Sequence, residues 1–340
     1  MKINTIGIVF ESREDALKAA STIVKKEHVN IDVLYHWREQ EEIDSIVGAI
    51  RNMGFEVRIL GTPSDIVSNM SIVKKQVDFI FNLSRGFRKR FRLSVTPAIF
   101  EATGIPYCGA DPYTKLVCQN KHLMKALWDK INIPTPPWVY IEDTSSLQDI
   151  VLPEFPLIIK PAFEGNSIGI NANAVAYNKE ELYAKIEAIN CTFNTPLIIE
   201  KFISGKEFKV VCIGNQNKKF VGMLEYLNPD GSSLKNEFVY FNAKLNGNYY
   251  QVRRNINLAE YKQIKSDCDK VYEMLLPVDY GTFDVRMDDC GKHYFLEFNA
   301  DDSLHPEGTF AQCCKLNDVG YDKMVSYILK TAFERWNLSV

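Results

Sequence analysis

The chain has 340 residues, of which 46% are hydrophobic and 24% are charged, as in an ordinary soluble globular protein with two or three domains. Its net charge of −3 offers no general positive surface, so neither nucleic acid nor an anionic membrane is an expected partner. The N-terminus is too polar for a signal peptide, and no apolar run approaches the roughly 20 residues of a membrane span. The eight cysteines form neither a zinc motif nor a disulfide framework, which favours a cytoplasmic protein.

Short apolar strands alternate with helix-length segments through the first third of the chain. The expected strands cover residues 4–10, 32–35, 55–60 and 77–83. This alternation predicts a parallel, doubly wound α/β domain. A helix over 119–130 follows and ends before a cluster of three prolines, and we expect a domain boundary near 110–118.

The rest of the chain mixes strands and helices without an internal repeat. The expected elements are strands at 156–160, 196–200 and 207–213, helices near 178–188 and 258–276, and a final strand pair before a C-terminal helix. A polar stretch over 228–248 lies between them.

The final strand pair carries the most specific pattern. Segments 282–287 and 293–299 are joined by Asp-Asp-Cys-Gly, a turn composition, so they should form an antiparallel hairpin. In the expected register residue 284 lies opposite 295 and residue 282 opposite 297, with Asp284, Glu297 and Asn299 on one face. The other face would carry Phe283, Val285, Leu296 and Phe298. Two carboxylates and an amide oxygen suit Mg²⁺, but a solvated polar face explains the pattern equally well.

Two earlier strands end in residues that suit a nucleotide. The strand at 156–160 delivers Lys160 to a loop with Gly165 and Gly169, whose backbone N–H groups can approach phosphate oxygens. The strand at 196–200 ends in Glu200, and a short connector leads to Glu207, as in a hinge that holds adenine and ribose. Ordinary turns are the simpler interpretation of each segment taken alone.

The order of these features resembles the ATP-grasp superfamily, and within it the D-alanine:D-alanine ligases and related carboxylate-amine ligases. The similar segments are FNLSRGF, PAIFEATGIPYCGADP, NKHLMKALWDKINIPTPPW, IIKPAFEGNSIGI, IIEKFISGKEF, FDVRMDDCGKHYFLEFN and GYDKMVSYIL. The resemblance implies an α/β protein with an ATP-grasp fold and an N-terminal doubly wound, Rossmann-like domain. The implied parts are an N-terminal domain at 1–115, a central subdomain with a glycine-rich lid at 116–196, and a C-terminal subdomain with the Mg²⁺ site at 197–340.

The resemblance also implies roles for individual residues. For the nucleotide phosphates it implies Lys121, Lys160 and a lid with Glu164, Gly165, Asn166 and Ser167. For adenine and ribose it implies Glu200, Lys201, Phe202, Ile203 and Glu207, and for the γ-phosphate Lys244 on a mobile loop. Asp284, Glu297 and Asn299 correspond to the ligands of two Mg²⁺ ions, with Mn²⁺ as an alternative. The candidate catalytic residues are Ser167, Lys244 and Arg286.

The implied reaction joins a small-molecule carboxylate to an amine through an acyl phosphate, with release of ADP and phosphate. A phosphate-transferring kinase, a carboxylase that activates bicarbonate, and a non-catalytic nucleotide-binding regulator are the alternatives. Dimers through the N-terminal domain are common in the family, which makes a homodimer an expectation.

The chain departs from the alanine ligases at two points near the hairpin. These ligases carry an arginine, which helps to hold the tetrahedral oxyanion, two residues before the metal aspartate, where this chain has Thr282; Arg286 is a candidate replacement. The loop after the hairpin carries the candidate substrate residues Asp301, Asp302, Ser303 and Glu307. Acids there would repel a free carboxylate and suit a cationic or neutral amine, which disfavours a cell-wall alanine ligase.

Two more candidate substrate residues lie in the N-terminal domain. Glu11 is a candidate for binding the ammonium group of the first substrate. Arg85 opens the run RGFRKRFR, with five cations in eight residues. This run is either a solvated face or a site that recognises an acidic substrate.

Overall fold

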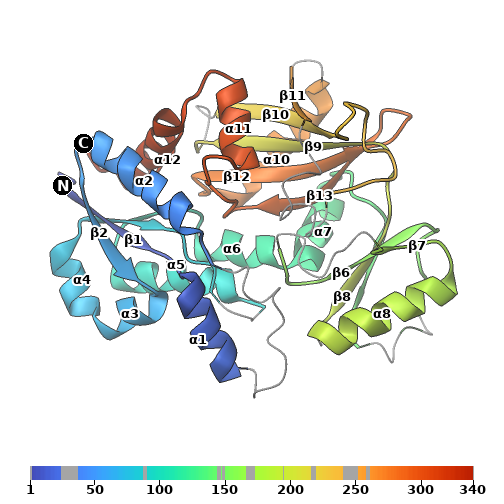
Figure 1. Cartoon of the computed structure of the whole chain (residues 1–340), viewed down its shortest axis with the longest axis horizontal. Helices are drawn as coiled ribbons and strands as arrows, with labels where there is room; N and C mark the ends of the chain where they lie inside the picture. Colours follow the sequence, from blue (N-terminus) through green and yellow to red (C-terminus); the bar gives the residue numbers. More distant parts are fainter. Residues whose placement is uncertain are drawn as a thin grey trace.

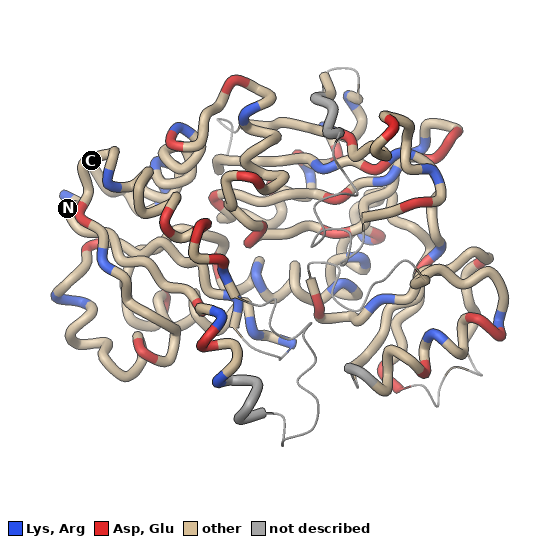
Figure 2. Tube along the Cα trace, viewed as in Figure 1, with Lys and Arg blue, Asp and Glu red and all other residues tan. Residues whose placement is uncertain are grey.

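The computed structural model describes residues 2–23, 37–86, 90–143, 147, 150–165, 173–193, 195–215, 220–239, 252–257 and 261–339. Three β-sheets and the helices packed on them form the molecule (Figure 1). Acidic and basic residues are interspersed along its described parts (Figure 2). The three sheets draw on strands within residues 5–108, 138–201 and 206–299, and the expected division of the chain after residues 115 and 196 stays a prediction. Among the described residues, no helix is both long and apolar enough to cross a membrane.

The N-terminal sheet is parallel throughout, as the sequence predicted. It contains β1 (Thr5–Val9), β2 (Glu56–Gly61), β3 (Phe79–Asn82) and β4 (Tyr107–Cys108) in the order β2-β1-β3-β4. Its helices are α1 (Arg13–Ile23), α2 (Gln40–Asn52), α3 (Pro63–Ser68), α4 (Met70–Gln76) and α5 (Arg92–Thr103). Apolar side chains of α2 and the C-terminal helix α12 (Tyr321–Arg335) pack with one set of strand residues, and those of α3, α4 and α5 with the other. The strand expected at 32–35 lies outside the described residues.

The central sheet is antiparallel and carries charged side chains on one face. Helices α6 (Pro112–Gln119) and α7 (Lys121–Lys130) lead to β5 (Trp138–Ile141), β6 (Leu157–Pro161), β7 (Val175–Ala176) and β8 (Leu197–Lys201), in the order β5-β8-β6-β7. Helix α8 (Lys179–Phe193) covers one face, where alternate residues of β6 and β8 form an apolar core. The period of two turns Lys160 and Glu200 to the opposite face.

The C-terminal sheet has five antiparallel strands. These are β9 (Lys206–Ile213), β10 (Phe220–Leu227), β11 (Val252–Ile256), β12 (Tyr280–Met287) and β13 (His293–Asn299), in the order β11-β10-β9-β12-β13. Strands β10 and β11 were not predicted. Helices α7 and α10 (Lys262–Leu275) pack on one face, and α11 (Thr309–Leu316) contacts β9 and β10.

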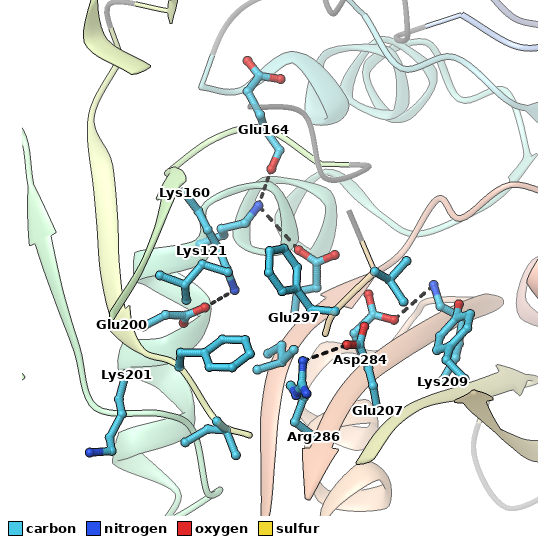
Figure 3. Close-up of a pocket in the computed structure, with 17 residues that line it drawn as sticks. Lys121, Lys160, Glu164, Glu200, Lys201, Glu207, Lys209, Asp284, Arg286 and Glu297 are labelled. Atoms are coloured by element: carbon cyan, nitrogen blue, oxygen red, sulfur yellow. Dashed lines mark hydrogen bonds and ion pairs between the residues drawn. The ribbon is translucent and has the colours of Figure 1, made fainter. Parts of the chain in front are cut away.

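Strand β9 shows how this second sheet acquires a charged region. Phe208, Val210 and Cys212 enter the core under α10. The alternate residues change along the strand, because Val211 and Ile213 pack in the core shared with α11 and α12, whereas Glu207 and Lys209 line a pocket. The charged half of this face is turned toward the charged face of the central sheet (Figure 3).

Candidate active site

The pocket between the two charged faces gathers most of the predicted nucleotide and metal residues (Figure 3). Lining it are Lys121, Lys160, Glu164, Glu200, Lys201, Phe202, Ile203, Glu207, Asp284, Arg286 and Glu297. These residues come from α7, both sheets and their connectors, so segments far apart in the sequence build one site. The predicted Asn166, Ser167 and Lys244 lie outside the described residues.

Glu200 is fully buried between two lysines. Its carboxylate pairs with Lys160 and lies 2.7 Å from Lys125 Nζ. Burial opposes ionisation of Glu200, but the two ammonium groups together hold its pKa below the usual value. Lys125 was not predicted, although it follows Lys121 by four residues and lies on the same face of α7. Two cations against one anion leave one positive charge uncompensated beside the pocket, which Lys160 lines, and this suits an anionic ligand.

Lys121 contacts both Glu164, the first residue of the predicted lid, and Glu297 of the hairpin. Its ammonium donates to the carbonyl oxygen of Glu164 and lies 3.5 Å from Glu297 Oε2 (Figure 3). Lys121 and Lys160 therefore approach the pocket from two elements, the first residue of α7 and strand β6. This arrangement suits a ligand with several negative charges.

The predicted hinge forms an apolar slot. The rings of Phe202 and Phe238 meet edge to face with centroids 5.8 Å apart. The side chain of Lys201 points away from the pocket (Figure 3). Its Nζ lies 3.2 Å from Oε2 of the exposed Glu154. Lys201 can therefore contribute only its backbone, and Phe202, Phe238 and Ile203 provide a flat apolar site of the kind that suits a purine ring.

The guanidinium group of Arg286 binds to this hinge. Its guanidinium lies 3.1 Å from Glu207 Oε2 and donates to the carbonyl oxygens of Gly205, Lys235 and Glu237. It also lies over the Phe202 ring, at 4.9 Å from the centroid. Alternation puts Arg286 on the face of Asp284 as expected, but its long side chain carries the charge to Glu207 and the hinge carbonyls. The geometry therefore does not favour the oxyanion role predicted for Arg286.

The hairpin forms as predicted but in another register. Asp284 pairs with Glu297 and Thr282 with Asn299, so the expected pairs 284 with 295 and 282 with 297 are wrong. The cause is a β-bulge, because Val285 already pairs with Phe295 and leaves one extra residue in β13.

The extra residue is Leu296, which lines the pocket instead of the apolar face expected for it. Phe283, Val285 and Phe298 do enter the core. The bulge thus leaves the predicted carboxylate face intact.

Asp284, Glu297 and Asn299 meet on that face. The amide nitrogen of Asn299 lies 3.2 Å from Asp284 Oδ2 and 3.2 Å from Glu297 Oε1. Among the described residues, no group of three or more His, Cys, Asp or Glu side chains is arranged to hold a metal. The donor set of two carboxylates and one amide nevertheless fits a hard cation such as Mg²⁺ that takes its remaining ligands from phosphate oxygens and water.

Lys209 is the main site residue that sequence reasoning missed. Its Nζ lies 3.2 Å from Asp284 Oδ1 and 2.8 Å from Asp302 Oδ2. Burial would lower the pKa of Lys209, but the two carboxylates raise it well above the usual value. Lys209 follows Glu207 by two residues in a strand, and that spacing was the signal that could have revealed it.

A second pocket adjoins the hairpin and contains part of the predicted substrate set. Arg85, Asp301 and Asp302 line it together with Arg92, Lys121, Glu297 and Asn299. The pKa of Asp301 is lowered even though burial opposes this, because Lys115 and arginines surround it. Arg85 and Arg92 are both buried, so these two members of the basic run do not form a solvated face.

The remaining predicted substrate residues line neither of these two pockets. Glu11 is buried and accepts hydrogen bonds from the backbone N–H groups of Arg85 and Gly86, at 2.8 and 3.1 Å. Its pKa is raised, chiefly by burial. Glu11 therefore positions the Arg85 segment in this structure, while Ser303 caps a local turn and Glu307 is exposed.

The fold and the paired charged faces define a nucleotide-binding protein with an ATP-grasp fold. A profile of the "D-ala D-ala ligase C-terminus" matches residues 127–330. The D-alanine–D-alanine ligase of Pseudomonas fluorescens is 24% identical over 92% of this chain and 94% of its own. Two solved structures share the fold at 98% and 97% coverage of this chain. The D-alanine–D-alanine ligase of Bacillus anthracis complexed with ATP has a TM-score of 0.70 at 19% identity over 99% of that chain. The VanG D-Ala:D-Ser ligase of Enterococcus faecalis has a TM-score of 0.69 at 18% identity over all of that chain.

The chain belongs to the D-alanine–D-alanine ligase family, whose members are ATP-dependent ligases that form carbon–nitrogen bonds. The predicted fold class is confirmed.

Proposed function

We propose that this protein is an ATP-dependent carboxylate-amine ligase that acts on amino-acid-type substrates and is not the cell-wall alanine ligase. The observation that carries the proposal is the convergence of Lys121, Lys160, Asp284 and Glu297 on one pocket beside an apolar slot. Asn299 lines the adjoining second pocket, and its amide nitrogen lies 3.2 Å from Asp284 Oδ2. Positive groups for phosphate, oxygen ligands for a cation and a site for a base are thus available together.

The nucleotide would lie along the first pocket. Phe202 and Phe238 would hold adenine, Glu207 would face the ribose, and the ammonium groups of Lys121 and Lys160 would neutralise phosphate oxygens. Asp284, Glu297 and Asn299 would hold Mg²⁺, which supplies further neutralisation of the triphosphate.

The reaction then has two steps. A carboxylate oxygen of the first substrate attacks the γ-phosphorus of ATP, the bond to the bridging oxygen breaks, and ADP leaves with the electron pair. The nitrogen of the second substrate attacks the carbonyl carbon of the acyl phosphate, the carbon–oxygen bond breaks, and phosphate leaves as nitrogen loses a proton. Lysines that neutralise the transferring group would lower the first barrier.

The second pocket supports amino-acid-type substrates. Its wall presents both signs of charge, with the buried Arg85 and Arg92 close to Asp301 and Asp302. Groups of opposite sign side by side suit a ligand that carries both an ammonium and a carboxylate group. Thr282 and the acidic loop at 301–302, which replace the alanine-ligase pattern, support a substrate other than a second alanine.

An assay of ADP and phosphate release over a panel of carboxylates and amines tests the proposal. Release of both with a pair, together with an amide detected by mass spectrometry, is the expected result, and alanine as both partners should be a poor substrate. A phosphorylated product without amide would indicate a kinase instead. The absence of release with every pair would favour a nucleotide-binding regulator. Homodimer formation stays a prediction, which sedimentation analysis checks.

A further inference from the structure

Lys209 joins the two pockets. It is buried, with 7% of its surface exposed, and lies on β9 directly across from Asp284 on β12. Its ammonium reaches Asp284 on the metal side at 3.2 Å and Asp302 on the substrate side at 2.8 Å. The cation therefore lies between the carboxylate that would hold Mg²⁺ and the loop that lines the second pocket.

The same contacts place this charge next to Thr282. The hydroxyl of Thr282 donates to Asp302 Oδ2 at 2.7 Å, and Lys209 contacts that same oxygen atom. Thr282 lies two residues before Asp284 on one face of β12, and it is fully buried and uncharged. A cation from the neighbouring strand thus occupies the region beside Thr282.

The other cationic side chains that line the first pocket contact other groups. Lys160 pairs with Glu200, Arg286 binds Glu207 and hinge carbonyls, and Lys201 points away toward Glu154. Lys121 contacts the lid residue Glu164. Among the cationic side chains described in this pocket, Lys209 is the one that contacts both Asp284 and the 301–302 loop.

An acyl-transfer site needs positive charge between the metal site and the substrate pocket, which is where Lys209 lies. When an amine attacks an acyl phosphate, the carbonyl oxygen gains negative charge, and a fixed donor in a site shielded from water stabilises that charge. We propose that Lys209 is the catalytic cation that faces the reacting carbonyl and that it shares Asp284 with the metal; this inference rests on the proposed function. The positive charge comes from β9, and Asp302 holds the ammonium in place.

The first test needs no substrate. Lys209→Met removes a positive charge 3.2 Å from Asp284, so Mn²⁺ used as a probe should bind the nucleotide-free protein about tenfold more tightly. Lys209→Arg keeps the charge and should bind Mn²⁺ within about threefold of the wild type. Isothermal titration of folded protein, checked by circular dichroism, gives the values. Equal Mn²⁺ affinity of wild type and Lys209→Met would overturn the shared use of Asp284.

The second test uses a substrate pair that the panel assay identifies. Lys209→Met should lower kcat by about 100- to 1000-fold while KM for ATP changes less than threefold. Adding Thr282→Arg should recover at least tenfold of the lost kcat, because it returns a cation to the same region. Lys265→Met, a charge loss on the exposed side of α10, should leave kcat unchanged.

Asp302→Asn separates catalysis from loop positioning. If Lys209 only anchored the loop, Asp302→Asn would lower kcat as much as Lys209→Met does, and that result refutes the catalytic role. A kcat of Lys209→Met within threefold of the wild type refutes it as well. The expected loss for Asp302→Asn is smaller and mainly in KM for the amine. A wild-type protein that forms no amide with any pair refutes the proposed function and the catalytic role together. In that case the Mn²⁺ titration still tests whether Lys209 and a metal ion share Asp284.

Discussion

Removal of the negative charge of Glu200 should destabilise the protein strongly. In Glu200→Gln, the ammonium groups of Lys125 and Lys160 remain in place, with side-chain exposures of 1% and 11%. Loss of one partner from a buried ion pair costs about 3–5 kcal/mol, because the remaining charge has neither water nor a counterion. We expect the free energy of unfolding to fall by about that amount at pH 7.

Urea unfolding followed by both circular dichroism and tryptophan fluorescence measures this change. Glu154→Gln is the matched control, since Glu154 is 92% exposed in its pair with Lys201 and should change stability by less than about 1 kcal/mol. A loss below about 1 kcal/mol in Glu200→Gln as well would refute the reasoning that Glu200 neutralises buried cations.

The pH dependence gives the same argument a second test. Burial lowers the pKa of Lys125, and Glu200 opposes that effect, so Glu200→Gln should lower it further. The folded variant then binds fewer protons than the unfolded chain, and its stability should rise with pH toward the wild-type value. A gap between variant and wild type that stays constant from pH 7 to pH 10 contradicts this explanation.

Three further predictions concern the hairpin, the hinge and the substrate loop. Glu297→Gln should abolish turnover with an unchanged circular dichroism spectrum, and normal turnover would refute its metal role. Gly205→Ala should destabilise the fold by more than about 2 kcal/mol, because φ is +137° and a Cβ would lie 2.0 Å from a β12 carbonyl oxygen. Gly291→Ala is the control, since φ is +82° but the space around it is open, and it should cost about 1 kcal/mol in the same urea assay. The pKa of Asp302 is depressed by Lys209 against the effect of burial, so its stabilising contribution is present above about pH 4 and lost at lower pH. Stability curves for Asp302→Asn should therefore fall less steeply in acid than those of the wild type, and parallel curves would contradict this.

Strand alternation explains how much of the site could be predicted from the sequence. Lys160 and Glu200 emerge from apolar strands at alternate positions, and the structure turns both to the same pocket. The same rule gathered Asp284, Glu297 and Asn299 correctly even though the expected register was wrong. A bulge shifts which residues are opposite each other, but the polar residues keep the face that avoids their burial in the core.

Side-chain reach explains what could not be predicted. Alternation placed Arg286 correctly on the face of Asp284, yet its long side chain ends among the hinge carbonyls of Gly205 and Lys235. Lys209, also on that face of the sheet, ends at Asp284 and Asp302. A sequence pattern gives the face of a strand and not the position of a charge several bonds away.

The positions of these two cations bear directly on how the site would work. Arg286 contacts Glu207 and three backbone carbonyl oxygens, and these contacts hold the hinge in place. Lys209 instead balances Asp284 and Asp302, two carboxylates whose charge a bound cation or a substrate ammonium would share. Ligands of that kind would weaken the hold of both carboxylates on Lys209 and strengthen its interaction with a developing oxyanion. Four acceptors hold Arg286 in place, so under this proposal the charge that would respond to a substrate is that of Lys209 on β9.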